Sequence, residues 1–188
     1  MVFPPAVIVH GLADARAAVA IGLPVTLLSA PGAGLYAGCL WWRGIVERVR
    51  RSMAAGNSAS HGASDPTVLT ELLASPQPLP ARRRGDFDLC SQGQPDTRAD
   101  TGPRAIVDIL DCADGAGQAM AALRAGVHNL VLWPDAPGWE AVAEVAASLG
   151  GCVLTKAPPA LDLAQRGAAR RLDAWLSGAG LRDSALIQ

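Results

Sequence analysis

The sequence lacks a surplus of charge of either sign. Lysine and arginine together number 16, against 17 aspartate and glutamate residues, and the formal net charge is −1. Proteins that bind nucleic acid usually carry a basic surplus that pairs with phosphate, so we expect no nucleic-acid partner. Lysine is especially scarce, because Lys156 is the only one in 188 residues. Lys156 therefore stands out among the candidate reactive residues.

Cysteine is also sparse, and its spacing lacks a metal-binding pattern. None of the four cysteines (Cys39, Cys90, Cys112 and Cys152) forms a C-x-x-C pair, and no histidine lies at a ligand spacing beside them. We therefore expect neither a zinc site nor a cofactor. Cys112 and Cys152 lie at or beside expected buried strands, where cysteine behaves as a small apolar residue. Reduced thiols fit a cytoplasmic protein best.

A typical signal peptide is missing, since no basic region precedes an apolar stretch at the N-terminus. One stretch resembles a membrane anchor: residues 17–42 carry no charge and end in Trp41–Trp42, which Arg43 follows. Two prolines and four glycines interrupt this stretch, which divides into a helix end, a strand, a turn and a second helix. We therefore expect no membrane partner. Membrane attachment is an alternative that solubility without detergent would dismiss.

What the sequence does contain is a repeated alternation of apolar strands and helices. Short apolar runs predict buried strands at residues 6–10, 24–29, 105–110, 129–133 and 152–155. A helix is expected after each strand, at about residues 12–22, 35–53, 115–125, 137–149 and 161–176. Continuous apolar runs are typical of strands covered on both faces. The pattern predicts one α/β domain over residues 1–188 with a five-stranded parallel, doubly wound, flavodoxin-like sheet; a half-barrel is the alternative.

The alternation is interrupted between the second helix and the third strand. Residues 52–103 are rich in Ser, Gly, Pro, Asp and Gln, and only residues 67–74 look able to form a short helix. A structureless loop this long is uncommon in a compact domain, so we interpret it as a polar, largely irregular insert. Its connections place it at the N-terminal edge of the sheet. Its Arg82–Arg84 run could contact an anionic partner, although a solvated loop is the more common role.

One segment resembles known families. The run DCADGAGQAMAALRAGVHNLVLWPDAPGWEAVAEVAASLGGCVL starts at Asp111. It resembles consecutive βα units of Schiff-base aldolase-type (β/α) barrels, and also the later half of response-regulator receiver domains, where A-L-R-A-G precedes a strand. The resemblance covers about 45 residues and carries no catalytic motif. The rest of the chain resembles short α/β proteins of proteobacterial type.

Each resemblance implies particular residues. In an aldolase-like barrel, Lys156 would be the Schiff-base lysine at the C-terminal end of a strand, but no accompanying Glu or Arg constellation is identifiable. In a receiver-like domain, Asp111 would match the phosphoacceptor, and Lys156 would match the lysine after the fifth strand. The acidic pair of a receiver is replaced by His10–Gly11, which leaves Mg²⁺ with too few oxygen ligands. The resemblance therefore allows a degenerate receiver, which lacks the acidic pair, rather than a working one.

Ligands of open α/β sheets bind beyond the carboxyl ends of the strands. The candidate residues at those ends are His10, Ser29, Asp111, Asp114, Trp133, Asp135 and Lys156. If the strand order were 2-1-3-4-5, His10 and Asp111 would face each other across a crevice and could carry out acid–base chemistry. A histidine that only bonds a loop carbonyl is the simpler interpretation. Asp111 and Asp114 could hold a cation, but Asp114 and Asp135 are better placed to cap helices.

The sequence Gly32-x-Gly34-x-x-Ala37 follows a strand and opens a helix, as a dinucleotide-binding fingerprint does. It follows the second strand rather than the first, and no acidic residue ends the next strand about 20 residues later. A tight turn with close helix–sheet contact explains the two glycines more simply.

No motif completes a catalytic set, so the sequence alone does not determine a function. The best interpretation is a small non-catalytic α/β module that binds a small anionic ligand or a protein partner, or a second copy of itself, at the C-terminal edge of the sheet. The alternatives are a Schiff-base lyase that uses Lys156 and a degenerate receiver-like signalling domain. His10, Asp111 and Lys156 are the candidate catalytic residues, and the others named at the strand ends, with Gly32 and Gly34, are the candidate ligand-binding residues.

Overall fold

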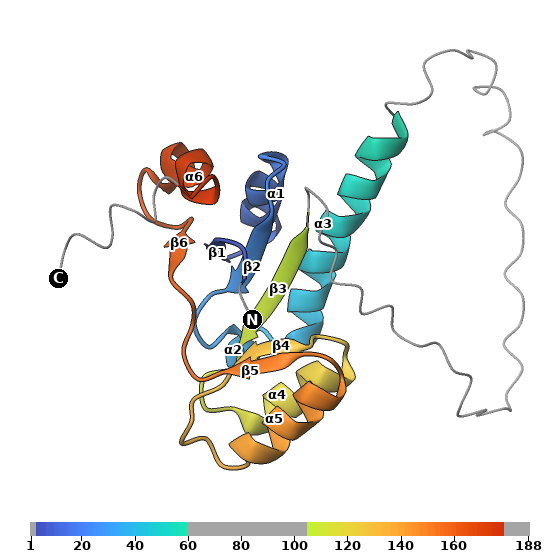
Figure 1. Cartoon of the computed structure of the whole chain (residues 1–188), viewed down its shortest axis with the longest axis vertical. Helices are drawn as coiled ribbons and strands as arrows, with labels where there is room; N and C mark the ends of the chain where they lie inside the picture. Colours follow the sequence, from blue (N-terminus) through green and yellow to red (C-terminus); the bar gives the residue numbers. More distant parts are fainter. Residues whose placement is uncertain (1–2, 60–104, 179–188) are drawn as a thin grey trace, which may run out of the picture.

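The computed structural model describes residues 3–59 and 105–178 (Figure 1). The described strands are β1 (Ala6–Val9), β2 (Val25–Ser29), β3 (Ile106–Asp111), β4 (Asn129–Val131), β5 (Cys152–Leu154) and β6 (Ala160–Asp162). The described helices are α1 (Leu12–Ala20), α2 (Ala33–Tyr36), α3 (Cys39–Ala59), α4 (Ala116–Arg124), α5 (Trp139–Ser148) and α6 (Ala168–Leu176). None of the helices in this part of the chain is both long and apolar enough to cross a membrane.

All strand pairings are parallel, and the strands form one sheet in the order β5-β4-β3-β2-β1-β6. This confirms the predicted α/β class with a parallel sheet. The sheet has six strands rather than five, because residues 160–162, expected near the start of the last helix, pair with β1 instead. Since β2 lies between β1 and β3, the 2-1-3-4-5 order is wrong, and no crevice separates the first strand from the third.

The two faces of the sheet are covered differently. All six helices contribute buried residues to one large cluster, together with strand residues such as Val7, Leu27 and Leu110. The opposite face carries a small apolar cluster around Leu28 and Ile109, and no helix residue belongs to it. Alternate residues of a strand point to opposite faces, which explains why neighbours along one strand enter different clusters. One helical layer and a consecutive strand order fit the half-barrel alternative.

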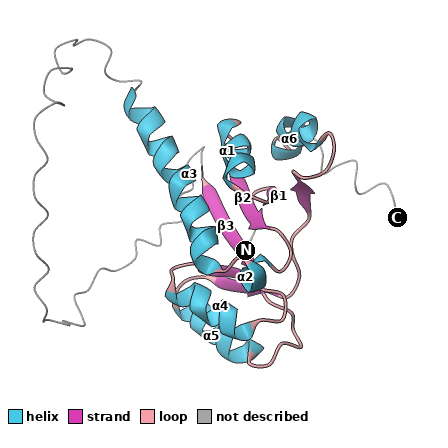
Figure 2. Cartoon of the chain, turned by 180° about the vertical axis from the view of Figure 1, so that it is seen from behind, coloured by secondary structure: helices cyan, strands magenta, loops and turns pink. Residues whose placement is uncertain are grey.

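The sheet is open between its two edge strands. Among the described strands, β5 and β6 pair with β4 and β1 but not with each other. Residues 155–159 run from β5 to β6 along this open side (Figure 1), and Ala157 packs against the small apolar cluster. Figure 2 shows from behind how α1 and α3 cover the strands, with α4 and α5 side by side at one end.

The helices predicted at 35–53 and 161–176 need correction, the latter because α6 begins only at Ala168. The single helix expected at 35–53 is two helices, α2 and α3, separated at Gly38, which has a φ of +83°. Helix α3 also continues through Ala59, so residues 52–59, assigned to the insert, are helical. The rest of the predicted insert, with Arg82–Arg84, lies outside the described residues. Trp42, in the tandem that resembled a membrane anchor, is fully buried in the core.

Candidate functional site

Asp111 binds two loops together at the carboxyl edge of the sheet. Its Oδ1 accepts hydrogen bonds from the backbone N–H groups of Gly32, at 3.0 Å, and Ala113, at 2.9 Å. Its own N–H donates to the Ser29 hydroxyl at 2.9 Å. Only 6% of Asp111 is exposed, and Ala113 has a φ of +49°, which is uncommon outside glycine. These bonds give Asp111 a structural role in holding the loops after β2 and β3.

The glycines of the predicted fingerprint are explained by packing. A Cβ on Gly34 would lie 2.7 Å from the Cys112 Sγ and 3.0 Å from the Asp111 carbonyl oxygen. Gly32 has a φ of +68°, and its N–H is donated to Asp111 instead of being free for a phosphate. The structure therefore accounts for both glycines by a turn and a close helix–sheet contact, as the simpler interpretation predicted.

His10 does meet a carboxylate, but that carboxylate belongs to Asp162. The His10 Nε2 and Asp162 Oδ1 atoms are 2.8 Å apart, at the ends of the neighbouring strands β1 and β6. The His10 backbone N–H donates to Asp14, and the Asp162 carboxylate also accepts the Ala164 N–H. Burial raises the pKa of Asp162, but the hydrogen bonds from His10 and Ala164 outweigh it, so the pKa lies below its usual value. Asp162 is therefore ionised at neutral pH.

Sequence reasoning missed Asp162 because residues 161–176 were assigned to a helix. The signal that could have found it is the Pro158–Pro159 pair followed by apolar Ala160 and Leu161. Proline fixes φ near the extended range and disfavours a helical residue before it, so the pair indicates an extended segment that two apolar residues continue. The resulting three-residue strand places Asp162 at the same edge as the other candidates.

The remaining predicted residues do not join these clusters. Lys156, Asp114 and Asp135 are exposed, and none of their side chains has a hydrogen bond or ion pair within the described ranges. The two aspartates do not cap helices as expected, because Gly115 and Gly138 occupy the N-cap positions of α4 and α5. No group of three or more potential metal ligands is found in residues 3–59 and 105–178.

Most of the exposed large apolar side chains lie in or beside segments that follow strands at the carboxyl edge of the sheet. Four of the five large hydrophobic residues that are exposed in the described chain lie in or beside the segments that follow β2 and β4: Leu35, Tyr36, Leu40 and Trp133. We call these four residues the apolar patch. The sequence predicted that Leu35 and Leu40 belong to one long helix, which the break at Gly38 divides. Tyr36 and Leu40 are the most exposed, at 69% and 72%.

The segments that carry the patch are joined through the loop after β3. The Trp133 N–H donates to the Ala113 carbonyl oxygen at 2.7 Å. The Leu35 side chain lies against Gly115, where an added Cβ would approach Leu35 Cδ2 to 2.4 Å. Asp114 lies between these two contact points in the sequence. Segments 30–42, 112–115 and 132–138 contain no lysine or arginine, whereas Asp114 and Asp135 are exposed there. The first arginine beyond Leu40 is Arg43, which is paired with Glu47.

Comparison with protein-family models, curated proteins and solved structures finds no match to this chain. The resemblance of residues 111–154 to aldolase barrels and receivers therefore stays a prediction. Asp111 and Lys156, which a receiver would bring together, form no hydrogen bond or ion pair with each other in the described structure.

Proposed function

We propose that this chain is a non-catalytic binding module that engages a protein partner at the carboxyl edge of β2, β3 and β4. The observation that carries the proposal is the apolar patch, since exposed hydrophobic residues gathered on one surface are typical of interaction sites. Exposed Asp114 and Asp135 supply negative charge beside it, and the three segments offer no positive charge. The partner segment that fits is one that combines apolar side chains with lysine or arginine.

The same charges give less support to a small anionic ligand at this edge. An anion would meet the exposed carboxylates without a lysine or arginine from these segments to pair with. The candidate catalytic groups also support a binding role: Asp111 holds backbone N–H groups, and Lys156 is exposed, whereas a reactive lysine needs burial to lower its pKa.

Selection from a display library of random 12-residue peptides tests the proposal. We expect enriched peptides to carry Arg or Lys beside Leu, Phe or Trp, and to bind more weakly at high salt. The double substitution Tyr36→Ser with Leu40→Ser should weaken their binding about tenfold or more, because each removed side chain contributes on the order of 1 kcal/mol. Ile21→Ser is the matched control, since Ile21 is the fifth exposed hydrophobic residue and lies at the end of α1, away from this edge.

Two results would overturn the proposal. One is enrichment of acidic peptides, which would contradict the charge argument. The other is equal loss of binding in the Ile21→Ser control and in the double variant, which would show that the peptides do not use the apolar patch. Far-ultraviolet circular dichroism establishes that each variant is folded.

A second candidate function is proton transfer by His10, which the 2.8 Å contact with ionised Asp162 favours. A histidine whose Nε2 is held by a carboxylate can accept a proton at Nδ1, and Nδ1 has no partner among the described residues. Deuterium exchange of the α-protons of pyruvate and dihydroxyacetone phosphate, followed by NMR, tests this. Loss of exchange in His10→Gln but not in Lys156→Ala supports it. The reverse pattern supports the Schiff-base alternative, and no exchange with wild type counts against both.

A further inference from the structure

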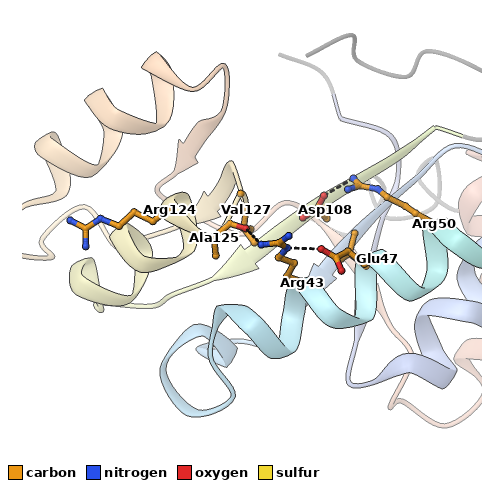
Figure 3. Close-up of a pocket in the computed structure, with 9 residues that line it drawn as sticks. Arg43, Glu47, Arg50, Asp108, Arg124, Ala125 and Val127 are labelled. Atoms are coloured by element: carbon orange, nitrogen blue, oxygen red, sulfur yellow. Dashed lines mark hydrogen bonds and ion pairs between the residues drawn. The ribbon is translucent and has the colours of Figure 1, made fainter. Parts of the chain in front are cut away.

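A pocket lies on the helical side of the sheet, near the N-terminal ends of β3 and β4 (Figure 3). None of the four residues of the apolar patch lines it, although Arg43 in its wall follows Leu40 by one turn of α3. Its volume is about 430 Å³, within the range of small-molecule sites. It is formed between α3, the start of β3 and the end of α4. The charged residues of its wall are Arg43, Glu47, Arg50, Asp108 and Arg124.

Two arginines of α3 are already oriented by carboxylates. Arg43 donates from Nε to Glu47 and from Nη1 to the Ala125 carbonyl oxygen, the latter at 3.0 Å. Arg50 donates from Nη2 to Asp108 at 2.8 Å. A guanidinium group has five N–H donors, so these bonds leave the Nη2 of Arg43 and the Nε and Nη1 of Arg50 without a partner in the described structure. The pocket wall therefore presents positioned cationic donors with spare capacity.

The two carboxylates differ in burial, and therefore in how easily each could be displaced from its arginine. Asp108 is only 15% exposed, so its pairing with Arg50 neutralises a largely buried charge. Glu47 is 44% exposed and pairs with Arg43 one helical turn away, as a surface pair on α3. Pairs of this kind contribute little stability, so another oxyanion can displace Glu47 from Arg43 at small cost.

Arg124 supplies the positive excess of the pocket. With three arginines and two carboxylates in the wall, the excess is one positive charge. Figure 3 shows the Arg124 side chain directed away from Arg43 and Arg50. It is exposed and has no partner among the described residues, so it is free to rotate towards a bound anion.

We infer that this pocket binds the oxyanion group of a small ligand, a phosphate or a carboxylate, through Arg43, with Arg124 closing over it and Glu47 displaced. The site is separate from the proposed partner surface. Arg50 stays paired with Asp108 and adds its remaining donors. The anionic ligand expected at the carboxyl edge is thus assigned to this pocket, beside the N-terminal ends of β3 and β4.

Isothermal titration calorimetry of the full chain with inorganic phosphate and with citrate, at matched ionic strength, tests the inference. We expect saturable one-to-one binding of at least one of them, and the stronger of the two identifies the oxyanion class. Arg43→Gln should lower the affinity about tenfold, as loss of a charge-assisted hydrogen bond does. Arg48→Gln removes the same charge from the same helix outside the pocket and should leave the affinity unchanged.

Glu47→Gln provides a test with the opposite sign that keeps every arginine. Because it removes the competing carboxylate, it should raise the affinity by about threefold to tenfold. Glu144→Gln, which removes one negative charge from α5 outside the pocket, should have no effect. The inference is overturned if no saturable binding occurs, if Arg48→Gln acts as strongly as Arg43→Gln, or if Glu47→Gln leaves the affinity unchanged or lowers it.

Discussion

The substitution Asp111→Ala should destabilise the fold strongly, although Asp111 occupies a position where a catalytic carboxylate was expected. It removes the acceptor of two backbone N–H groups, from Gly32 and Ala113, and leaves the Ala113 N–H without a partner in a buried site. An unpaired buried donor costs about 1–3 kcal/mol. Loss of both bonds, partly offset because no buried carboxylate remains, gives an expected loss of about 2–4 kcal/mol in the free energy of unfolding.

Chemical denaturation followed by circular dichroism measures this loss. Asp111→Asn keeps an oxygen in place of Oδ1 and should lose only about half as much. Asp114→Ala is the control three residues away; its side chain is exposed and unpaired in the described structure, so its effect should stay within about 0.5 kcal/mol. If Asp111→Ala is as stable as the control, Asp111 does not hold the loops, and its burial would need a functional explanation.

Three further predictions concern other parts of the described chain. Gly34→Ala should lower the free energy of unfolding by about 1–3 kcal/mol, because the added Cβ meets Cys112 and backbone atoms. Gly44→Ala, which has open space on α3, should raise it by about 0.5–1 kcal/mol. Equal stability of the two variants in thermal or chemical unfolding would refute the packing explanation. The wild type should exceed Asp162→Asn in free energy of unfolding by the full amount at neutral pH. This difference should shrink as the pH falls through the usual carboxyl pKa of 3.8 and below, because the pKa of Asp162 is lowered in the folded chain. A difference that grows in acid would contradict the prediction. Burial, and the nearby charge of Asp111, raise the pKa of the Cys112 thiol to about 12 from 9.0, and the side chain is fully buried. Alkylation of Cys112 at pH 8, read by mass spectrometry, should therefore be far slower in the folded than in the unfolded chain; rapid labelling of the folded chain would refute this.

The elements that the sequence predicted well are those with a local signal. The first five strands lie where apolar runs were found, because each run is long enough to be recognised without knowledge of its neighbours. Strand β6 has three residues, and its pairing with β1 joins positions more than 150 residues apart in the chain. No local pattern contains that partner, so residues 161 and 162 were assigned to the adjacent helix instead.

Strand order was not predictable from the same runs. Strands covered on both faces have continuous apolar sequences, whether the second cover is another helical layer or the inner face of a half-barrel. In this chain the inner face is closed by Leu28, Ile109 and Val131, with no helix residue. A periodicity argument cannot distinguish that cluster from a second set of helices.

The site was predicted in part. Ser29 and Asp111 were placed at one edge by the strand-end rule, and the structure joins them to each other and to Gly32 by hydrogen bonds. The prediction that His10 faces Asp111 was wrong, because it depended on the 2-1-3-4-5 strand order. The Asp111 carboxylate proved to be a backbone acceptor, a role that the residue type alone does not reveal.

Both proposals depend on the charges at the two edges of the sheet, and helix dipoles alone can account for part of that distribution. Helices that follow parallel strands begin at the carboxyl edge, where their positive dipole ends favour acidic residues, and end at the opposite edge, where basic residues are favoured. Exposed Asp114 and Asp135 near helix starts, and Arg124 in the last turn of α4, therefore have a sufficient structural explanation. Glu47 is explained by its ion pair with Arg43 and not by a helix dipole, because it lies in the interior of α3 on the wall of the arginine pocket. A gain in anion affinity on its neutralisation is thus an effect that helix dipoles do not produce.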